Sequence, residues 1–265
     1  MKAFLGCAVL FLSLLQVTPA SAQEQNWLPP GSETQPSRPI PEWVLGGALE
    51  GDALIGRLLF HSPSLLGEKA VRMRISCASC HPSGHLNERF FIPDVSSDPG
   101  NVDLTHKFWF EGGEDGDFNP KPIPSLQNSR EAKIFGTGPV FGSLEEFSRH
   151  VIIDEFGGPE PDGFILEALA AYMGQLTRPE TNGAAPLSRP ISFKTYLDLA
   201  ETSPRQLDLI ADLLIEEAGR RERFEQKDQY RQIATELKKL RTGSLSEALK
   251  LDTISKLREL SKRIP

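Results

Sequence analysis

Two cysteines and a histidine stand together in the run Cys77-Ala78-Ser79-Cys80-His81. Two thiols three residues apart, followed directly by an imidazole, form the attachment pattern of c-type haem. Each thiol can add to one vinyl group of the porphyrin, and the short turn then brings the imidazole under the ring. We therefore expect Cys77 and Cys80 to form covalent thioethers with one haem c. His81 is the predicted proximal ligand of the iron.

Two other uses of a CxxC pair have to be weighed, a thioredoxin-like redox site and half of a zinc site. A thioredoxin-like site needs a βαβ setting, which the sequence around this motif lacks. A zinc site would need two further ligands from a small supply, namely His61, His85, His106 and His150. Covalent haem is therefore the favoured interpretation of the motif.

The N-terminal segment has the pattern of an export signal. Lys2 precedes an apolar run over residues 4–15, and the small residues Ala20-Ser21-Ala22 then offer a cleavage site. The run is too short to cross a bilayer core of roughly 30 Å, although a retained membrane anchor is the alternative. We expect cleavage near Ala22, which would remove Cys7 and leave a periplasmic protein without a stable membrane span.

The charge balance bears on possible partners. The chain of 265 residues has 29 Lys and Arg against 36 Asp and Glu, a net charge of −7, which argues against a nucleic-acid-binding protein. A long segment over residues 90–122 is rich in Gly, Asp, Asn and Pro, and loops of this length are usually functional or mobile. Its acidic run at residues 111–120 predicts a docking surface for basic redox partner proteins.

The same acidic run imitates the start of a calcium-binding loop. Asp115, Asp117 and Asn119 have the alternating spacing of such a loop. Pro120 and Leu126 stand where an EF-hand requires Gly and the closing Glu, so an EF-hand is excluded. A solvated acidic loop is favoured over a calcium site of another type.

Two segments with helical spacing would have to position the haem. Apolar residues form one stripe over residues 49–60, and a second apolar face runs over residues 163–176 before Pro179. Gly56 lies inside the first segment, where the lack of a side chain allows another backbone to come close. The spacing predicts two helices packed in a core, as small cytochromes pack an N-terminal and a C-terminal helix beside the haem.

Five short motifs occur in a characteristic order: GRLLF at 56–60, SCASCH at 76–81, IPSLQN at 123–128, SLEEF at 143–147 and AYMGQL at 171–176. Together they resemble one haem domain of the bacterial di-haem cytochrome c peroxidase and MauG superfamily. The resemblance implies an all-α, cytochrome c-like haem domain with long loops. Peroxidases of that family hold two haems in two such domains, whereas this chain has one CxxCH motif. We therefore expect a mono-haem protein and not a complete di-haem enzyme.

The sixth iron ligand is the main open question. In the family's electron-transferring domain this ligand follows the LEE motif closely, often as Met or Tyr, but here Val151 occupies that position and cannot bind iron. His150, one residue earlier, is the predicted distal ligand, and the alternative is a histidine that only packs or hydrogen-bonds on its helix. An open sixth position is a further alternative, and other candidate ligands are Met173, His85, His106 and Met73.

Composition divides the chain into five expected regions: a signal peptide 1–22, a Pro-rich arm 23–45, the haem domain 46–178, a Pro-rich linker 179–203 and a helical tail 204–265. Apolar residues recur at helical spacing in the helical tail, which predicts an amphipathic hairpin or three helices. Residues 201–265 hold 14 Lys and Arg against 12 Asp and Glu, so their charges are mixed. The helical tail would either pack on the haem domain or make a subunit contact with another chain.

These observations predict a periplasmic c-type cytochrome that carries single electrons. The alternative is a haem oxidoreductase of peroxidase type, acting on peroxide or a small oxidant at an open iron. A third hypothesis is a subunit that its helical tail docks into a larger redox complex. The sixth ligand separates the first two, and the electron carrier is favoured over the enzyme.

Overall fold

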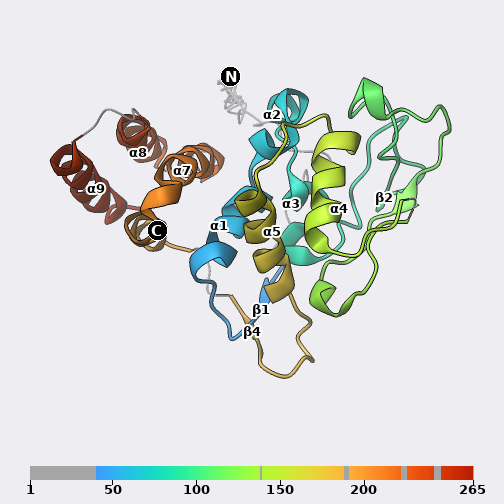
Figure 1. The fold of residues 1–265 in the computed structure, drawn as a ribbon, viewed down its shortest axis with the longest axis horizontal. Coiled ribbons are helices and arrows are strands. Elements are labelled where there is room, and N and C mark those ends of the chain that lie inside the picture. The colour runs from blue at the N-terminus through green and yellow to red at the C-terminus, as the bar shows by residue number, and fades with distance from the viewer. Residues whose placement is uncertain (1–39, 138, 188–190, 222–225, 242–245, 265) are drawn as a thin grey trace, which may run out of the picture.

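The computed structural model describes residues 40–264 apart from 138, 188–190, 222–225 and 242–245 (Figure 1). The predicted signal peptide, Cys7 and residues 23–39 of the predicted arm lie outside the described residues. In the described part of the chain helices dominate and the strands are short, which confirms the predicted all-α class.

The α-helices are α1 (Gly51–Phe60), α2 (Glu68–Met73), α3 (Cys77–Cys80), α4 (Leu144–His150), α5 (Gly163–Gln175), α6 (Phe193–Thr202), α7 (Leu207–Arg221), α8 (Lys227–Leu240) and α9 (Glu247–Ser261). A π-helical turn, η5 (Val151–Glu155), continues α4. The short 3₁₀ turns are η1 (Pro63–Leu66), η2 (Pro82–Gly84), η3 (Glu111–Gly113), η4 (Ser129–Glu131) and η6 (Pro204–Gln206). Two antiparallel pairs join β1 (Trp43–Leu45) to β4 (Ala184–Pro186) and β2 (Asn101–Val102) to β3 (Lys121–Pro122).

Helices α1 and α5 pack against each other at the centre of the molecule (Figure 1). Gly56 of α1 meets the backbone of α5, and a Cβ atom there would lie 1.8 Å from the backbone oxygen of Ala168. It would also lie 2.9 Å from the Cβ atom of Tyr172. The close backbone approach that the sequence predicted at Gly56 is confirmed, and the structure makes glycine a steric requirement of the crossing.

Helix α1 is buried on more than the face toward α5. Seven consecutive residues of α1, Leu54–Phe60, are buried, although the sequence predicts a single apolar stripe. A helix buried all round must be covered on both sides. The second cover comes from the C-terminal helices, because α7 packs against α1 (Figure 1).

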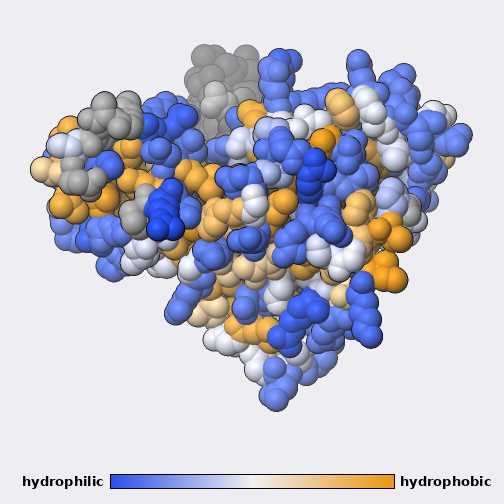
Figure 2. Space-filling model, in the orientation of Figure 1, coloured by the Kyte–Doolittle hydropathy of each residue, from blue (hydrophilic) through white to orange (hydrophobic). Residues whose placement is uncertain are grey.

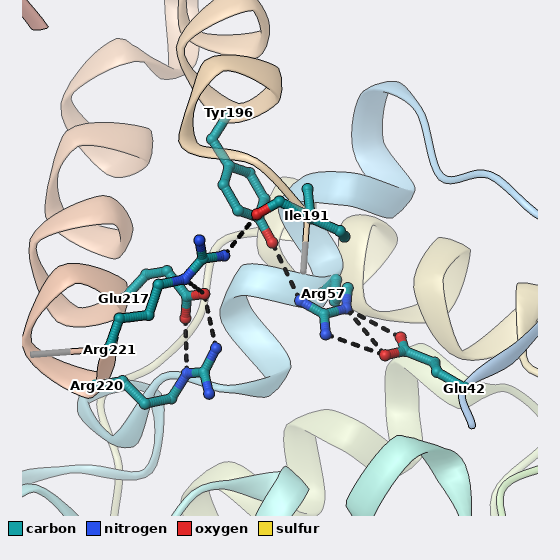
Figure 3. A network of polar contacts seen from close by, with 7 residues as sticks. All are labelled: Glu42, Arg57, Ile191, Tyr196, Glu217, Arg220 and Arg221. Atoms are coloured by element: carbon teal, nitrogen blue, oxygen red, sulfur yellow. Dashed lines mark hydrogen bonds and ion pairs between the residues drawn. The ribbon is translucent and has the colours of Figure 1, made fainter. Parts of the chain in front are cut away.

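A buried polar network occupies the junction between α1 and the C-terminal helices (Figure 3). Arg57 donates from Nε and Nη2 to the carboxylate of Glu42, at 3.0–3.2 Å, and from Nη1 to the hydroxyl oxygen of Tyr196 on α6, at 3.1 Å. Tyr172 of α5 donates to the same carboxylate at 2.7 Å. Since Glu42 is fully buried, these bonds provide the compensation that a buried charge requires.

A second ionic group lies beside the first, within α7 (Figure 3). Glu217 is buried and accepts hydrogen bonds from Arg220 and Arg221, with the shortest distances at 2.7 Å. Burial opposes ionisation of Glu217, but the two guanidinium groups outweigh it and hold its pKa well below the usual range. Arg221 also donates to the backbone oxygen of Ile191 at 2.8 Å, which fixes the chain just before α6.

The helical tail begins earlier than the sequence predicts. Helix α6 (Phe193–Thr202) lies inside the segment expected to be a linker, and Ser192 caps it by accepting from the backbone N–H of Thr195. Phe193 and Tyr196 of α6 are buried, so apolar burial makes this segment part of the packed structure. The prolines of residues 179–203 predicted a linker. The last of them, Pro190, precedes α6 and therefore does not interrupt it. We therefore define the helical tail as residues 193–264.

The end of the predicted arm also belongs to the folded domain. β1 pairs with β4, with Val44 opposite Ala185, and Val44 is fully buried. Glu42 lies one residue before β1 and carries the buried carboxylate described above. A count of prolines and small polar residues did not reveal this pairing.

The helical tail packs on α1 of the same chain. Within it α7 contacts α8, α8 contacts α9, and α9 returns to α6. Ser62, just after α1, donates to Glu216 of α7 at 2.6 Å. Of the two arrangements that the sequence left open, the structure has the helical tail packed on its own chain.

The surface is mixed in polarity. Figure 2 shows hydrophobic residues exposed in patches among hydrophilic ones, both over the helical tail and over the loops on the other side. The most exposed large hydrophobic residues include Ile134 and Val140, on the loop before α4. Helices with the length and apolarity needed to cross a membrane do not occur in the described part of the chain.

We expect Gly56→Ala to destabilise the protein by about 1–3 kcal/mol or more, because the added methyl group would overlap the backbone of α5. Gly174→Ala is the matched control. Gly174 is a helical residue of α5 with open space around its Cα, so alanine should stabilise the protein by up to about 1 kcal/mol. Denaturant unfolding of the two variants measures both effects, and equal stabilities would contradict the steric role of Gly56.

Acidification should lower the free energy of unfolding through protonation of His61. Burial, then the positive charges of Arg57 and Arg220, lower the pKa of His61 well below its usual value, with Arg221 adding to them and Glu217 opposing them. The neutral imidazole therefore stabilises the fold above about pH 6.5, and this contribution is lost as the pH falls. Between about pH 6 and pH 5 the unfolding free energy of the unsubstituted protein should fall as the pH is lowered. In His61→Gln we expect this slope to be smaller by up to about 1 kcal/mol per pH unit. Urea unfolding at several pH values measures it, and parallel pH profiles would contradict it.

Candidate haem-attachment site

The CxxCH motif forms the short helix α3, which local hydrogen bonds hold in place. Ser76 and Ser79 make a capping box, in which each side chain accepts from the backbone N–H of the other. Asn87 closes the turn from outside, because its amide donates to the Ser79 carbonyl at 2.9 Å and its backbone N–H donates to the Cys80 carbonyl at 2.9 Å. The two thiols and the imidazole are thus carried by a small, well-anchored turn.

Cys77 and Cys80 are both free thiols, the first half-buried and the second buried. Burial raises the pKa of Cys77 to about 12. Burial also raises the pKa of Cys80, with smaller contributions from Cys77 and Glu155. A redox-active CxxC depends on a lowered thiol pKa, so these surroundings disfavour the thioredoxin-like alternative.

His81 follows α3 directly and is half-buried. Burial lowers the pKa of His81 to about 4, and a backbone interaction with Pro124 partly opposes this. Since proline has no backbone N–H, the interacting group is the Pro124 carbonyl. The Nδ1 atom of His81 is buried and has no hydrogen-bond partner among the described residues. Near neutral pH the imidazole is therefore neutral, the form that binds a metal.

His150, the predicted distal ligand, lies at the end of α4. Its Nδ1 atom is 2.8 Å from a carboxylate oxygen of Asp154, and its Nε2 atom is 3.6 Å from Oε1 of Glu155. A metal-binding histidine commonly donates its other ring N–H to a carboxylate. The pairing with Asp154 therefore fixes the orientation of the imidazole. In this orientation Nε2 lies just beyond hydrogen-bond distance of Glu155. Whether His150 binds iron stays a prediction.

Glu155 is a residue near this site that the motifs of the sequence did not reveal. It ends the π-helical turn η5, and its side chain is 14% exposed. Burial raises the pKa of Glu155 against the influence of His150, and its Oε2 atom is buried without a hydrogen-bond partner among the described residues. Glu155 also contributes to the raised pKa of Cys80, after burial and Cys77. The only sequence signal for it was the LEE helix, because a π-helical turn has no simple sequence pattern.

The other candidate ligands lie in different surroundings. His85 Nε2 is 3.3 Å from the carbonyl oxygen of Pro41, and His106 Nδ1 accepts from the backbone N–H of Phe108 at 3.1 Å. Met173 is buried in α5, and Met73 is the last residue of α2 and partly buried. Iron ligation by any of these four residues stays a prediction that competes with ligation by His150.

The long segment over residues 90–122 has a small core of its own. Trp109 is buried, packs on Phe90 and Phe156, and donates from Nε1 to the Asp103 carbonyl at 2.7 Å. In the acidic run Asp115 accepts from the backbone of Asp117 and the amide of Asn119. Groups of three or more His, Cys, Asp or Glu placed to hold a metal ion do not occur among the described residues.

The site residues come from segments far apart in the sequence. The motif IPSLQN supplies the Pro124 carbonyl that interacts with His81, and the π-helical turn after the LEE helix supplies Glu155. Comparison of the chain with family models, with curated proteins and with solved structures found no match in any of the three. The functional interpretation therefore rests on the residues and their geometry.

We predict that His150→Ala changes the ferric haem spectrum from low-spin to high-spin, because it removes the predicted sixth ligand. Asp154→Asn is the matched control, since an asparagine can still accept from Nδ1 of His150 and should keep the low-spin spectrum. Ultraviolet–visible and electron paramagnetic resonance spectra of the purified variants provide the measurement. A low-spin spectrum unchanged in His150→Ala would show that another residue binds the iron.

Proposed function

We propose that this protein is a periplasmic c-type cytochrome that carries single electrons through one haem. Cys77 and Cys80 would hold the haem by thioether bonds, and His81 would bind its iron. The observation that carries the proposal is the CxxCH turn with two free thiols and a neutral imidazole, whose Nδ1 atom is buried and has no hydrogen-bond partner among the described residues.

The donor set of the turn fits a c-type haem. Thioether attachment needs two reduced thiols on one turn, and α3 presents them three residues apart. Iron ligation through Nε2 leaves Nδ1–H in need of an acceptor, and the Pro124 carbonyl is an uncharged acceptor of the kind that metal-binding histidines use. The packing of α1 on α5 supports a cytochrome c-like domain, as does the order of the five motifs.

The haem would supply a site that stores one electron, and the chain would set its properties. Asn87 and the capping box hold the turn, so that the thiols and His81 keep their relative positions. The acidic run of residues 111–120 would favour basic redox partner proteins through long-range attraction.

A specific observation keeps a second function in view, a peroxidase-type oxidoreductase acting on peroxide or a small oxidant. Glu155 has one buried carboxyl oxygen without a partner among the described residues, and burial raises its pKa. Chemistry of this type requires an open iron and a nearby group that holds or moves a proton. Glu155 would be a candidate for that role, since its charge also affects the pKa of Cys80.

We expect the purified protein to contain one covalent haem c, seen as a haemochrome in alkaline pyridine after extraction with acidified acetone. Cys77→Ser and Cys80→Ser should each leave one thioether and move the pyridine haemochrome band to longer wavelength, while the double variant should lose covalent haem. A protein that binds no haem would overturn both functions. A high-spin ferric spectrum that changes on addition of peroxide would favour the enzyme over the electron carrier.

A further inference from the structure

The segment over residues 123–128 brings the Pro124 carbonyl to His81, and three backbone hydrogen bonds anchor it. Ile123 donates to the Gly100 carbonyl, Leu126 to the Gly84 carbonyl and Asn128 to the Leu176 carbonyl, each at 2.9 Å. These acceptors lie in the long loop, in η2 and at the end of α5. The position of the Pro124 carbonyl therefore depends on how this segment is fixed at its ends.

Asn128 makes the densest set of contacts in this segment. Its amide oxygen faces three donors, the Thr177 hydroxyl at 2.8 Å, the Arg178 backbone N–H at 3.1 Å and the Thr181 hydroxyl at 3.4 Å. Its backbone has a φ of 62°, in the left-handed region that asparagine tolerates better than most residues. One side chain thus ties the segment to the chain that follows α5.

The neighbours of Asn128 reinforce the same connection. Gln127 donates from its amide to the Thr177 carbonyl at 2.9 Å, and Ser129 donates to the Met173 carbonyl at 2.9 Å. Met173 lies in the last turn of α5, and Thr177 follows the helix. The Met173 carbonyl also accepts from the backbone N–H of Leu176, so it is shared between the helix end and the segment.

We propose that Asn128 is a positioning residue for the haem ligand His81, because it holds the Pro124 carbonyl where Nδ1–H of the iron-bound imidazole can donate to it. This inference rests on the proposed haem function and extends it to the control of the iron site. A histidine that donates to a firm acceptor is a stronger electron donor to its metal and favours the ferric state. Loosening the segment should therefore raise the midpoint potential of the haem.

The test compares variants that loosen the segment to different degrees. Asn128→Gly deletes the amide but keeps the left-handed backbone without strain. Thr177→Val removes the closest donor to the amide at nearly constant volume, and Thr181→Val removes the most distant one. Ser192→Ala is the control for general destabilisation, since it deletes the cap of α6 without touching the segment. None of these substitutions changes the net charge.

We expect spectroelectrochemical titration to show the highest midpoint potential in Asn128→Gly, a smaller rise in Thr177→Val and little change in Thr181→Val. Ser192→Ala should lose stability but keep the original potential. The proposal is overturned if Asn128→Gly and Thr177→Val both keep that potential, or if Ser192→Ala shifts it equally. If Asn128→Gly does not fold, the Thr177→Val result decides. The pyridine haemochrome is measured first, because a protein without covalent haem overturns the proposed function together with this inference.

Discussion

The contact between α1 and α5 at Gly56 is the constraint on which the rest of the structure depends. It brings two backbones so close that a single added carbon would overlap Ala168. Because α5 follows the long loops in sequence, this one contact closes the domain around the CxxCH turn. The segment over residues 123–128 is tied to the end of α5 and to the residue that follows it, and α4 packs on α5.

The burial of α1 also buries the charge of Arg57, and the polar network compensates that charge. Arg57 follows Gly56 directly, so its side chain leaves α1 toward the helical tail and is buried there. A guanidinium group in that position needs partners, which Glu42 provides from the segment before α1 and Tyr196 from α6. Removing Glu42 would leave the buried charge of Arg57 uncompensated, and removing Tyr196 would leave one of its buried N–H groups without a partner. The network therefore favours this one docking of the helical tail.

The predicted haem-attachment turn illustrates how local and long-range interactions contribute to one site. Ser76, Ser79 and Asn87 shape the turn within about a dozen residues of chain. The Pro124 carbonyl interacts with His81 from a segment that lies much later in the sequence. In the proposed function the local group would hold the thiols for attachment, and the Pro124 carbonyl would act on the iron ligand.

The sequence by itself determined the features that depend on short spacing: the CxxCH motif, the helices around residues 49–60 and 163–176, and the room for a close backbone approach at Gly56. These features follow from steric and periodic rules that act within a few residues. Only the tertiary structure decided that Gly56 meets α5, that Arg57 is buried against Glu42 and Tyr196, and that α6 belongs to the helical tail. It also decided that Glu155 is largely buried. The physical reason is that burial and charge compensation depend on which distant segments meet, and composition contains no record of such contacts.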